Sequence, residues 1–163
     1  MNNLTQIPFN LPGKIFRSPM PYSFFDTNAS ILKDYLEANV GTVVMLTETG
    51  EDLKHANRDL TRAYTGHKIN VIHFPIVDFD TPDDPDKLRK VLQQVLEMAK
   101  GGENIAVHCF AGRGRTGMFI ALLARLILQM EGQEAIDWVR QYFPAIETSA
   151  QERVVIEYEL DEL

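Results

Sequence analysis

The chain of 163 residues contains one cysteine, so no disulfide can form within it. Its first nine residues have neither the basic segment nor the apolar segment of a secretory signal. We therefore expect a reduced thiol and a cytoplasmic location. The four histidines are scattered along the sequence, and with one cysteine they form no metal-ligand cluster. No metal or other cofactor is expected.

Long hydrophobic runs are also missing. The longest, residues 118–128, includes Arg125 and is too short to cross a bilayer, so we expect no membrane span. The net charge of −7 argues against nucleic acid or an anionic membrane as the main partner. Apolar residues make up 45% of the chain, which is enough for a packed core. The length fits a single catalytic domain over residues 1–163, and we expect a monomer.

Strand and helix patterns alternate along the first two thirds of the chain. Apolar, mostly β-branched runs predict strands at 42–46, 71–77 and 104–108. Helical spacing predicts helices at 30–39, 52–64 and 88–99, followed by helices only at 118–128, 133–142 and 150–158. This order predicts an α/β fold: a central, mostly parallel sheet with helices on both sides and a helical C-terminal half.

The most informative stretch joins a predicted buried strand to a predicted buried helix. It reads His-Cys-Phe-Ala-Gly-Arg-Gly-Arg-Thr-Gly over residues 108–117. Its glycines allow a tight turn that points backbone N–H groups inward, and the following helix presents its positive end to the same place. The planar fork of Arg115 matches two phosphate oxygens. These features predict an anion site.

The same positive field acts on Cys109, because a cation and a helix N-terminus favour a thiolate over a thiol. Cys109 is thus a candidate nucleophile. We expect the Thr116 hydroxyl to hydrogen-bond the sulfur and help it leave. His108 is expected to hydrogen-bond loop backbone and fix the shape of the loop, and a chemical role in tuning the thiol stays open beside a purely structural one.

A cysteine, five residues, an arginine and Thr-Gly resemble the signature of the cysteine-based protein tyrosine phosphatase superfamily. His108 and Gly112 strengthen the resemblance, which covers nearly the whole chain and includes blocks at 11–13, 17–19, 46–48 and 145–148. It implies a protein tyrosine phosphatase-like fold and metal-independent hydrolysis through a phosphocysteine intermediate. The residues implied to bind the substrate phosphate are Phe110, Ala111, Gly112, Arg113, Gly114 and Arg115.

Such a mechanism needs an acid on a second loop to protonate the leaving oxygen. By chemistry alone the candidates are four carboxylates of one proline-containing segment: Asp78, Asp80, Asp83 and Asp84. The segment beginning Phe-Pro-Ile-Val-Asp at Phe74 resembles the acid loop of small dual-specificity phosphatases, in particular the kinase-associated and Cdc14-like branch. This resemblance favours Asp78.

Two further side chains have two interpretations each, and a third has one. Gln151 positions the hydrolytic water or, as we favour, completes a capping box with Thr148. Arg113 serves as a second phosphate-binding cation, as in some lipid-phosphate phosphatases, or faces solvent, which we favour. For Arg17, a family block residue, we expect no more than an ion pair with a carboxylate at the sheet edge.

The sequence therefore predicts a phosphatase but leaves its substrate open. A phosphorylated protein or peptide, a phosphoinositide and a small phosphate ester are all compatible with the motif. No added segment for a deep phosphotyrosine pocket is evident, so phosphoserine and phosphothreonine remain candidates beside phosphotyrosine. A non-catalytic phosphate-binding adaptor is the alternative from another class. The presence of Cys109, Asp78 and Thr116 together argues against it, because a pure binding module needs none of them.

Overall fold

The computed structural model describes residues 3–160, which fold around one five-stranded sheet in the order β1-β2-β5-β3-β4. β1 runs antiparallel to β2, and the other neighbours are parallel. The predicted mostly parallel sheet is confirmed. The strands are β1 (Thr5–Ile7), β2 (Ile15–Ser18), β3 (Val40–Met45), β4 (Asn70–His73) and β5 (Asn104–His108).

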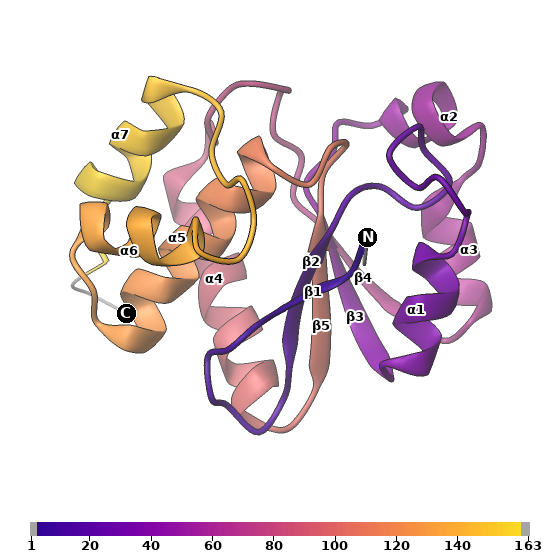
Figure 1. The fold of residues 1–163 in the computed structure, drawn as a ribbon, viewed down its shortest axis with the longest axis horizontal. Coiled ribbons are helices and arrows are strands. Elements are labelled where there is room, and N and C mark those ends of the chain that lie inside the picture. The colour runs from indigo at the N-terminus through magenta and orange to yellow at the C-terminus, as the bar shows by residue number, and fades with distance from the viewer. Residues whose placement is uncertain (1–2, 161–163) are drawn as a thin grey trace.

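Helices cover both faces of the sheet, as Figure 1 shows. One face carries α1 (Ile31–Glu37), α2 (Glu51–Ala56) and α3 (Leu60–Gly66). The other carries α4 (Pro85–Lys100), α5 (Gly114–Leu128), α6 (Gly132–Val139) and α7 (Ser149–Glu157), so the predicted helical C-terminal half is confirmed. Within residues 3–160, no helix has the length and apolarity that a bilayer crossing requires.

The central strand β5 has apolar side chains on both faces of the sheet, so helices must cover both faces. Ile105 and Val107 of β5 belong to the core cluster beneath α4 and α5, whereas Ala106 between them belongs to the cluster beneath α1 and α3. Successive side chains of a strand point to opposite faces, so β5 is buried on both. Each fully buried Ile or Val contributes about 1.5–3 kcal/mol, which makes β5 a fixed platform for the loop that follows it.

Two sequence expectations on element boundaries were wrong. The strand expected at 71–77 ends at His73, because Pro75 has no N–H to continue the ladder, although Phe74 and Ile76 still donate to the carbonyls of Met45 and Leu46. The helix expected at 52–64 is two helices. Asn57 adopts a left-handed conformation that ends α2, and Asp59 caps α3 by accepting from the Arg62 N–H. The short strands β1 and β2 were not expected at all.

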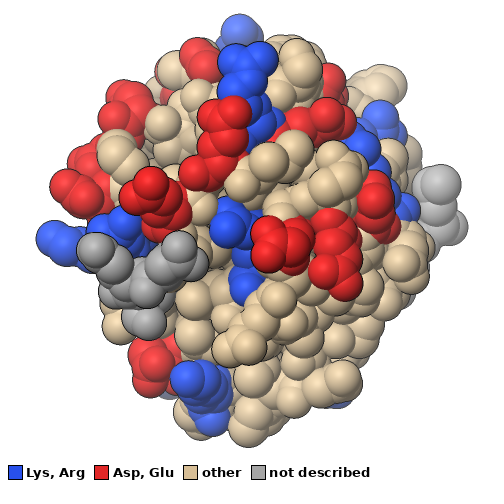
Figure 2. Space-filling view, turned by 90° about the vertical axis from the view of Figure 1, so that its left-hand side faces the viewer, with Lys and Arg blue, Asp and Glu red and all other residues tan. Residues whose placement is uncertain are grey.

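Charges are mixed on the face shown in Figure 2, which views the helical half of the molecule. Acidic and basic side chains alternate there with uncharged surface. The excess of acidic residues is therefore not gathered into one patch on this face. Three of the four parallel strands, β3, β4 and β5, end at the upper edge of the sheet in Figure 1, where the loops that follow them meet.

Candidate active site

The predicted anion-binding segment forms the turn between β5 and α5, and we call residues 109–115 the Cys109 loop. Cys109 is 2% exposed, and α5 begins at Gly114 within the loop. Gly112 has a φ of 72°, and a Cβ there would lie 2.3 Å from the carbonyl oxygen of Ser18. Only glycine combines this backbone conformation with such a close approach to β2. The structure therefore confirms the tight turn between strand and helix.

Arg17 has a different place from the one expected. It pairs with no carboxylate of residues 3–160; its buried guanidinium donates to the carbonyl oxygens of Gly112 and Ala111 in the Cys109 loop. It also lies over the ring of Phe143, 4.7 Å from the centroid. Burial lowers the pKa of Arg17 to about 10, which leaves it charged at neutral pH. Arg17 thus braces the loop from β2, where sequence spacing gave no hint of the contact.

The side chain of Arg115 is 1% exposed and has several polar partners. Its two terminal nitrogens donate to Glu51 Oε2 and Oε1 at 2.7 and 3.1 Å, and one also donates to the Ile76 carbonyl at 3.0 Å. Burial alone would lower the pKa of Arg115, but the hydrogen bonds to Glu51 and the charge of Cys109 raise it above its ordinary value. Arg115 Nε is buried and has no partner among the described residues.

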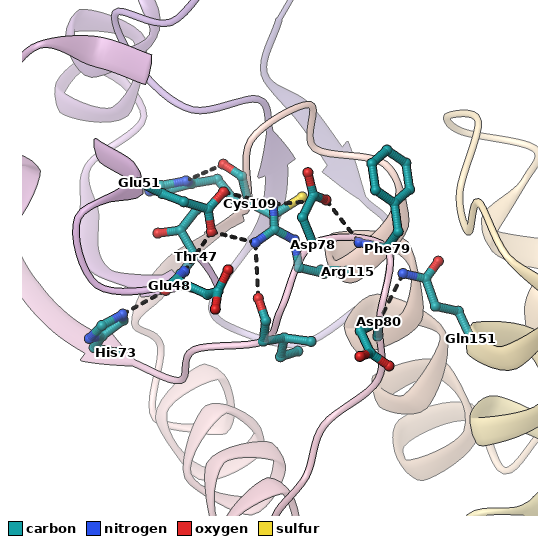
Figure 3. Close-up of polar contacts among 12 residues, drawn as sticks. Thr47, Glu48, Glu51, His73, Asp78, Phe79, Asp80, Cys109, Arg115 and Gln151 are labelled. Carbon is teal, nitrogen blue, oxygen red and sulfur yellow. Dashed lines mark hydrogen bonds and ion pairs between the residues drawn. The ribbon is translucent and has the colours of Figure 1, made fainter. Parts of the chain in front are cut away.

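Glu51, the first residue of α2, was missed by the sequence reasoning. Its carboxylate is half of a fork-to-fork pair with Arg115 and fixes the plane of the guanidinium. Figure 3 shows this pair with the sulfur of Cys109 behind it. An acidic residue at the start of a helix is common in any protein, so nothing in the sequence indicates that this one reaches across 64 residues to Arg115.

His108 is fully buried and hydrogen-bonds the loop backbone, as expected. Nδ1 lies 2.9 Å from the carbonyl oxygen of Cys109, and Nε2 lies 2.8 Å from the hydroxyl of Tyr64. The carbonyl can only accept, so Nδ1 carries the proton and Nε2 accepts from Tyr64. Burial lowers the pKa of His108 to about 4, and the nearby charge of Arg115 acts in the same direction. The imidazole is therefore neutral at physiological pH.

The expected hydrogen bond from Thr116 to the sulfur does not form in this structure. Thr116 lies in the first turn of α5 and is fully buried, yet its hydroxyl has no hydrogen-bond partner within residues 3–160. The helical turn places Thr116 next to Arg115, but the hydroxyl does not reach Cys109. Its expected help to the leaving thiolate stays a prediction.

The candidate acids lie on the segment after β4, residues 74–84, which we call the Asp78 loop. Asp78 Oδ1 is 3.0 Å from a terminal nitrogen of Arg115, and the side chain is 40% exposed. Asp80 is exposed and accepts from the N–H of Thr81, and Asp84 caps α4. Among these three, Asp78 is the carboxylate that the fold brings to Arg115.

Gln151 is fully buried and completes the capping box of α7 with Thr148, as favoured. Ser149 and Glu152 have the spacing of a second capping box, but none forms, because Thr148 is the N-cap and Ser149 is already helical. Gln151 also reaches the Asp78 loop, where its Nε2 donates to the Asp80 carbonyl at 3.2 Å. Its expected role with water stays a prediction.

Aromatic side chains line one side of the Cys109 loop. Phe110 stacks on His55 of α2 at 3.9 Å and meets the edge of Phe25 at 5.1 Å. Arg113 is exposed and lies 5.9 Å from the centroid of Phe25. A groove of about 470 Å³ adjoins this side and includes Ala111 and Arg113 of the loop. The surroundings of the loop are therefore partly apolar, with one exposed cation.

Comparison with known families matches residues 24–130 to the family described as "Polymorphic toxin system, DSP-PTPase phosphatase". The match covers the Asp78 loop, the Cys109 loop and all of α5. The chain belongs to this family of dual-specificity phosphatases. The resemblance to small members of the protein tyrosine phosphatase superfamily, read from the motif, is thereby confirmed.

Individual relatives agree with the family. The chain is 31% identical over 125 residues to tyrosine-protein phosphatase cdc-14 of Caenorhabditis elegans, covering 76% of this chain and 16% of the relative. It is 28% identical over 120 residues to mouse cyclin-dependent kinase inhibitor 3, covering 72% of this chain and 56% of the relative. The chain thus spans little more than half of one relative and a small part of the other.

Solved structures share the fold. Kinase-associated phosphatase superposes with a TM-score of 0.84 at 21% identity, over 95% of this chain and 92% of that one. PTPMT1, solved in complex with PI(5)P, gives a TM-score of 0.73 at 20% identity, over 88% of both chains. The protein tyrosine phosphatase-like fold expected from the sequence is confirmed.

Proposed function

We propose that this chain is a phosphomonoester hydrolase of the dual-specificity type that works through a phosphocysteine at Cys109. The observation that carries the proposal is the arrangement at Arg115. A buried guanidinium is fixed by Glu51 beside the thiol, and its Nε–H lacks a partner among the described residues. A buried donor without a partner is costly, and an anionic oxygen of a bound substrate would satisfy it.

In the first step the Cys109 thiolate attacks phosphorus, and the S–P bond forms as the P–O bond to the leaving group breaks. Arg115 and the N–H groups at the start of α5 stabilise the charge on the other oxygens. Asp78 lies 3.0 Å from Arg115, so it is within reach of an oxygen of a phosphate held by that guanidinium. Asp78 gives its proton to the leaving oxygen.

In the second step a water molecule attacks the same phosphorus, and the S–P bond breaks to release inorganic phosphate. Asp78, now a carboxylate, takes the proton of the water. The exposure of Asp78 gives solvent access to the place where the first product leaves. No residue outside the two loops is needed as a base, and we expect chelators to leave turnover unchanged.

The nucleophile is tested with Cys109→Ser and p-nitrophenyl phosphate as substrate. We expect turnover to fall to background, because a serine hydroxyl is not ionised at neutral pH. Retention of binding to inorganic phosphate by the same variant would show that the site is still folded. Turnover at the level of the unsubstituted protein would refute the mechanism.

The acid is tested by comparing Asp78→Asn with Asp80→Asn. Both carboxylates lie on the Asp78 loop, but the Asp80 carboxylate accepts from the adjacent Thr81 N–H rather than lying against Arg115. Loss of a general acid reduces kcat by about 10²–10⁴-fold, and we expect that loss for Asp78→Asn alone. If Asp80→Asn is the impaired variant, the assignment of the acid fails while the nucleophile stands.

A phosphoinositide or another substrate with several phosphates is the second candidate, and Arg113 favours it. This cation is exposed at the edge of the Cys109 loop, beside a groove. PTPMT1, a neighbour in fold, has been solved with PI(5)P. A panel of phosphopeptides and soluble inositol phosphates should separate the classes when measured with Arg113→Ala and, as a control for surface charge, Arg62→Ala. A loss confined to multiply phosphorylated substrates in Arg113→Ala would support the second candidate.

A further inference from the structure

Gln151 has more contacts than a helix cap requires. The side-chain Oε1 of Gln151 accepts from the main-chain N–H groups of Glu147 and Thr148 at 3.0 and 3.3 Å. The main-chain N–H of Gln151 donates to Thr148 Oγ1 at 3.1 Å. These bonds complete the capping box and use only the oxygen end of the amide. The nitrogen end is left for another partner.

That partner lies on the Asp78 loop. Gln151 Nε2 donates to the carbonyl oxygen of Asp80 at 3.2 Å, across 71 residues of sequence. Figure 3 shows the amide of Gln151 directed at Asp80, two residues after Asp78. The bond therefore joins the α7 cap to the backbone just beyond the proposed acid.

Besides this bond, the tip of the Asp78 loop is attached by the ion pair of Asp78 with Arg115, and the Asp80 N–H closes a turn on the Val77 carbonyl. Val77 and Phe79 are 52% and 59% exposed, so no burial of apolar side chains holds the tip in place. Before the tip, the loop is fixed where the Ile76 carbonyl accepts from Arg115. After it, the next anchor is Asp84 at the start of α4. The bond from Gln151 to Asp80 is thus a main-chain tether in the middle of an exposed segment.

The same amide lies against the Cys109 loop. A Cβ on Gly114, the first residue of α5, would lie 3.1 Å from Gln151 Oε1. Just before α7, the Ile146 N–H donates to the Arg113 carbonyl at 3.0 Å. Gln151 therefore sits at a junction where the start of α7, the start of α5 and the Asp78 loop meet.

We propose that Gln151 is a positioning residue that holds the Asp78 loop over the Cys109 loop, through its bond to the Asp80 carbonyl. The inference rests on the proposed function, since it needs Asp78 to act as the acid. A displacement of about 1 Å at a reacting group can lower a rate by about 10²-fold, so one tether can matter although a single hydrogen bond is weak.

The test uses Gln151→Glu, because a glutamate keeps the capping box but cannot donate to the Asp80 carbonyl. Thr148→Ala is the matched control: it removes a bond of the cap and leaves the tether. Each variant is assayed with phenyl phosphate, whose leaving oxygen needs a proton, and with 2,4-dinitrophenyl phosphate, whose leaving oxygen does not. We expect kcat/KM of Gln151→Glu, which reports the first step alone, to fall roughly 10–100-fold on phenyl phosphate and less than about 3-fold on the dinitro substrate.

Equal losses of kcat/KM on both substrates would overturn the inference, because the first step would then be impaired whether or not its leaving oxygen needs a proton. Unchanged rates, or the same pattern in Thr148→Ala, would overturn it as well. Amide hydrogen exchange gives a readout independent of activity: residues 79–81 should exchange faster in Gln151→Glu than in Thr148→Ala. If the unsubstituted chain hydrolyses neither ester, the proposed function itself fails, which is distinct from any of these patterns.

Discussion

The neutral state of buried His108 makes the stability of the fold depend on pH. In the folded chain its pKa is lowered from 6.5 to about 4, mainly by burial. Between these values the unfolded chain takes up a proton that the folded chain does not. The free energy of unfolding therefore falls as the pH falls through this window, whereas above pH 6.5 the contribution of His108 is complete.

The size of the effect follows from the two pKa values. The difference between 6.5 and about 4 corresponds to roughly 3 kcal/mol of unfolding free energy, lost at no more than about 1.4 kcal/mol per pH unit. That is a large fraction of the stability of an ordinary domain, which is about 5–15 kcal/mol. His108 alone should make the chain markedly less stable at pH 4 than at pH 7.

The assay is urea unfolding at several pH values from 4 to 7, for the unsubstituted chain and for His108→Asn. Asparagine does not titrate, and its side-chain amide can still donate to the Cys109 carbonyl in place of His108 Nδ1. The variant should be less stable at pH 7. The slope of its unfolding free energy against pH should be smaller than that of the unsubstituted chain, by an amount that corresponds to the uptake of up to one proton. Parallel pH profiles for the two proteins would refute the assignment of a neutral, buried imidazole.

Three other substitutions test the surroundings of the Cys109 loop. Glu51→Gln should weaken inhibition by inorganic phosphate about tenfold or more, because Arg115 loses the charge that fixes it, while Glu48→Gln at a nearby exposed position serves as the control. Gly112→Ala should lower kcat by more than about 10²-fold, since the added Cβ would lie 2.3 Å from a carbonyl oxygen of β2, and normal kinetics would contradict that geometry. Tyr64→Phe should cost about 1–3 kcal/mol in urea unfolding by leaving His108 Nε2 without its donor, and an unchanged midpoint would argue against this bond.

The regular elements near the site were largely predictable. The strand at 104–108 was placed correctly, and so were the helices on either side of it, because buried strands and helices impose strong periodic patterns on the sequence. The short strands β1 and β2 were missed, since three or four residues are too few to show a period. The split between α2 and α3 was missed because the left-handed turn at Asn57 leaves only a weak signal.

The side-chain contacts of the site were much less predictable. Local sequence indicated that Gly112 lies in a tight turn and that Gln151 caps a helix, because both depend on neighbours a few residues away. It did not indicate that Glu51 holds Arg115 or that Arg17 binds loop carbonyls. Those contacts join residues 64 to 95 positions apart.

The sequence alone predicts the chemistry, because a cysteine, an arginine and glycines at fixed spacing between a strand and a helix are typical of an anion-binding thiol loop. A spacing of this kind acts within one turn of chain, so it can be read without knowing the fold. The tertiary structure decided which carboxylates face that loop. Parallel strands end at one edge of the sheet, and this brings Asp78 and Glu51 to Arg115 while leaving Asp80 at the surface.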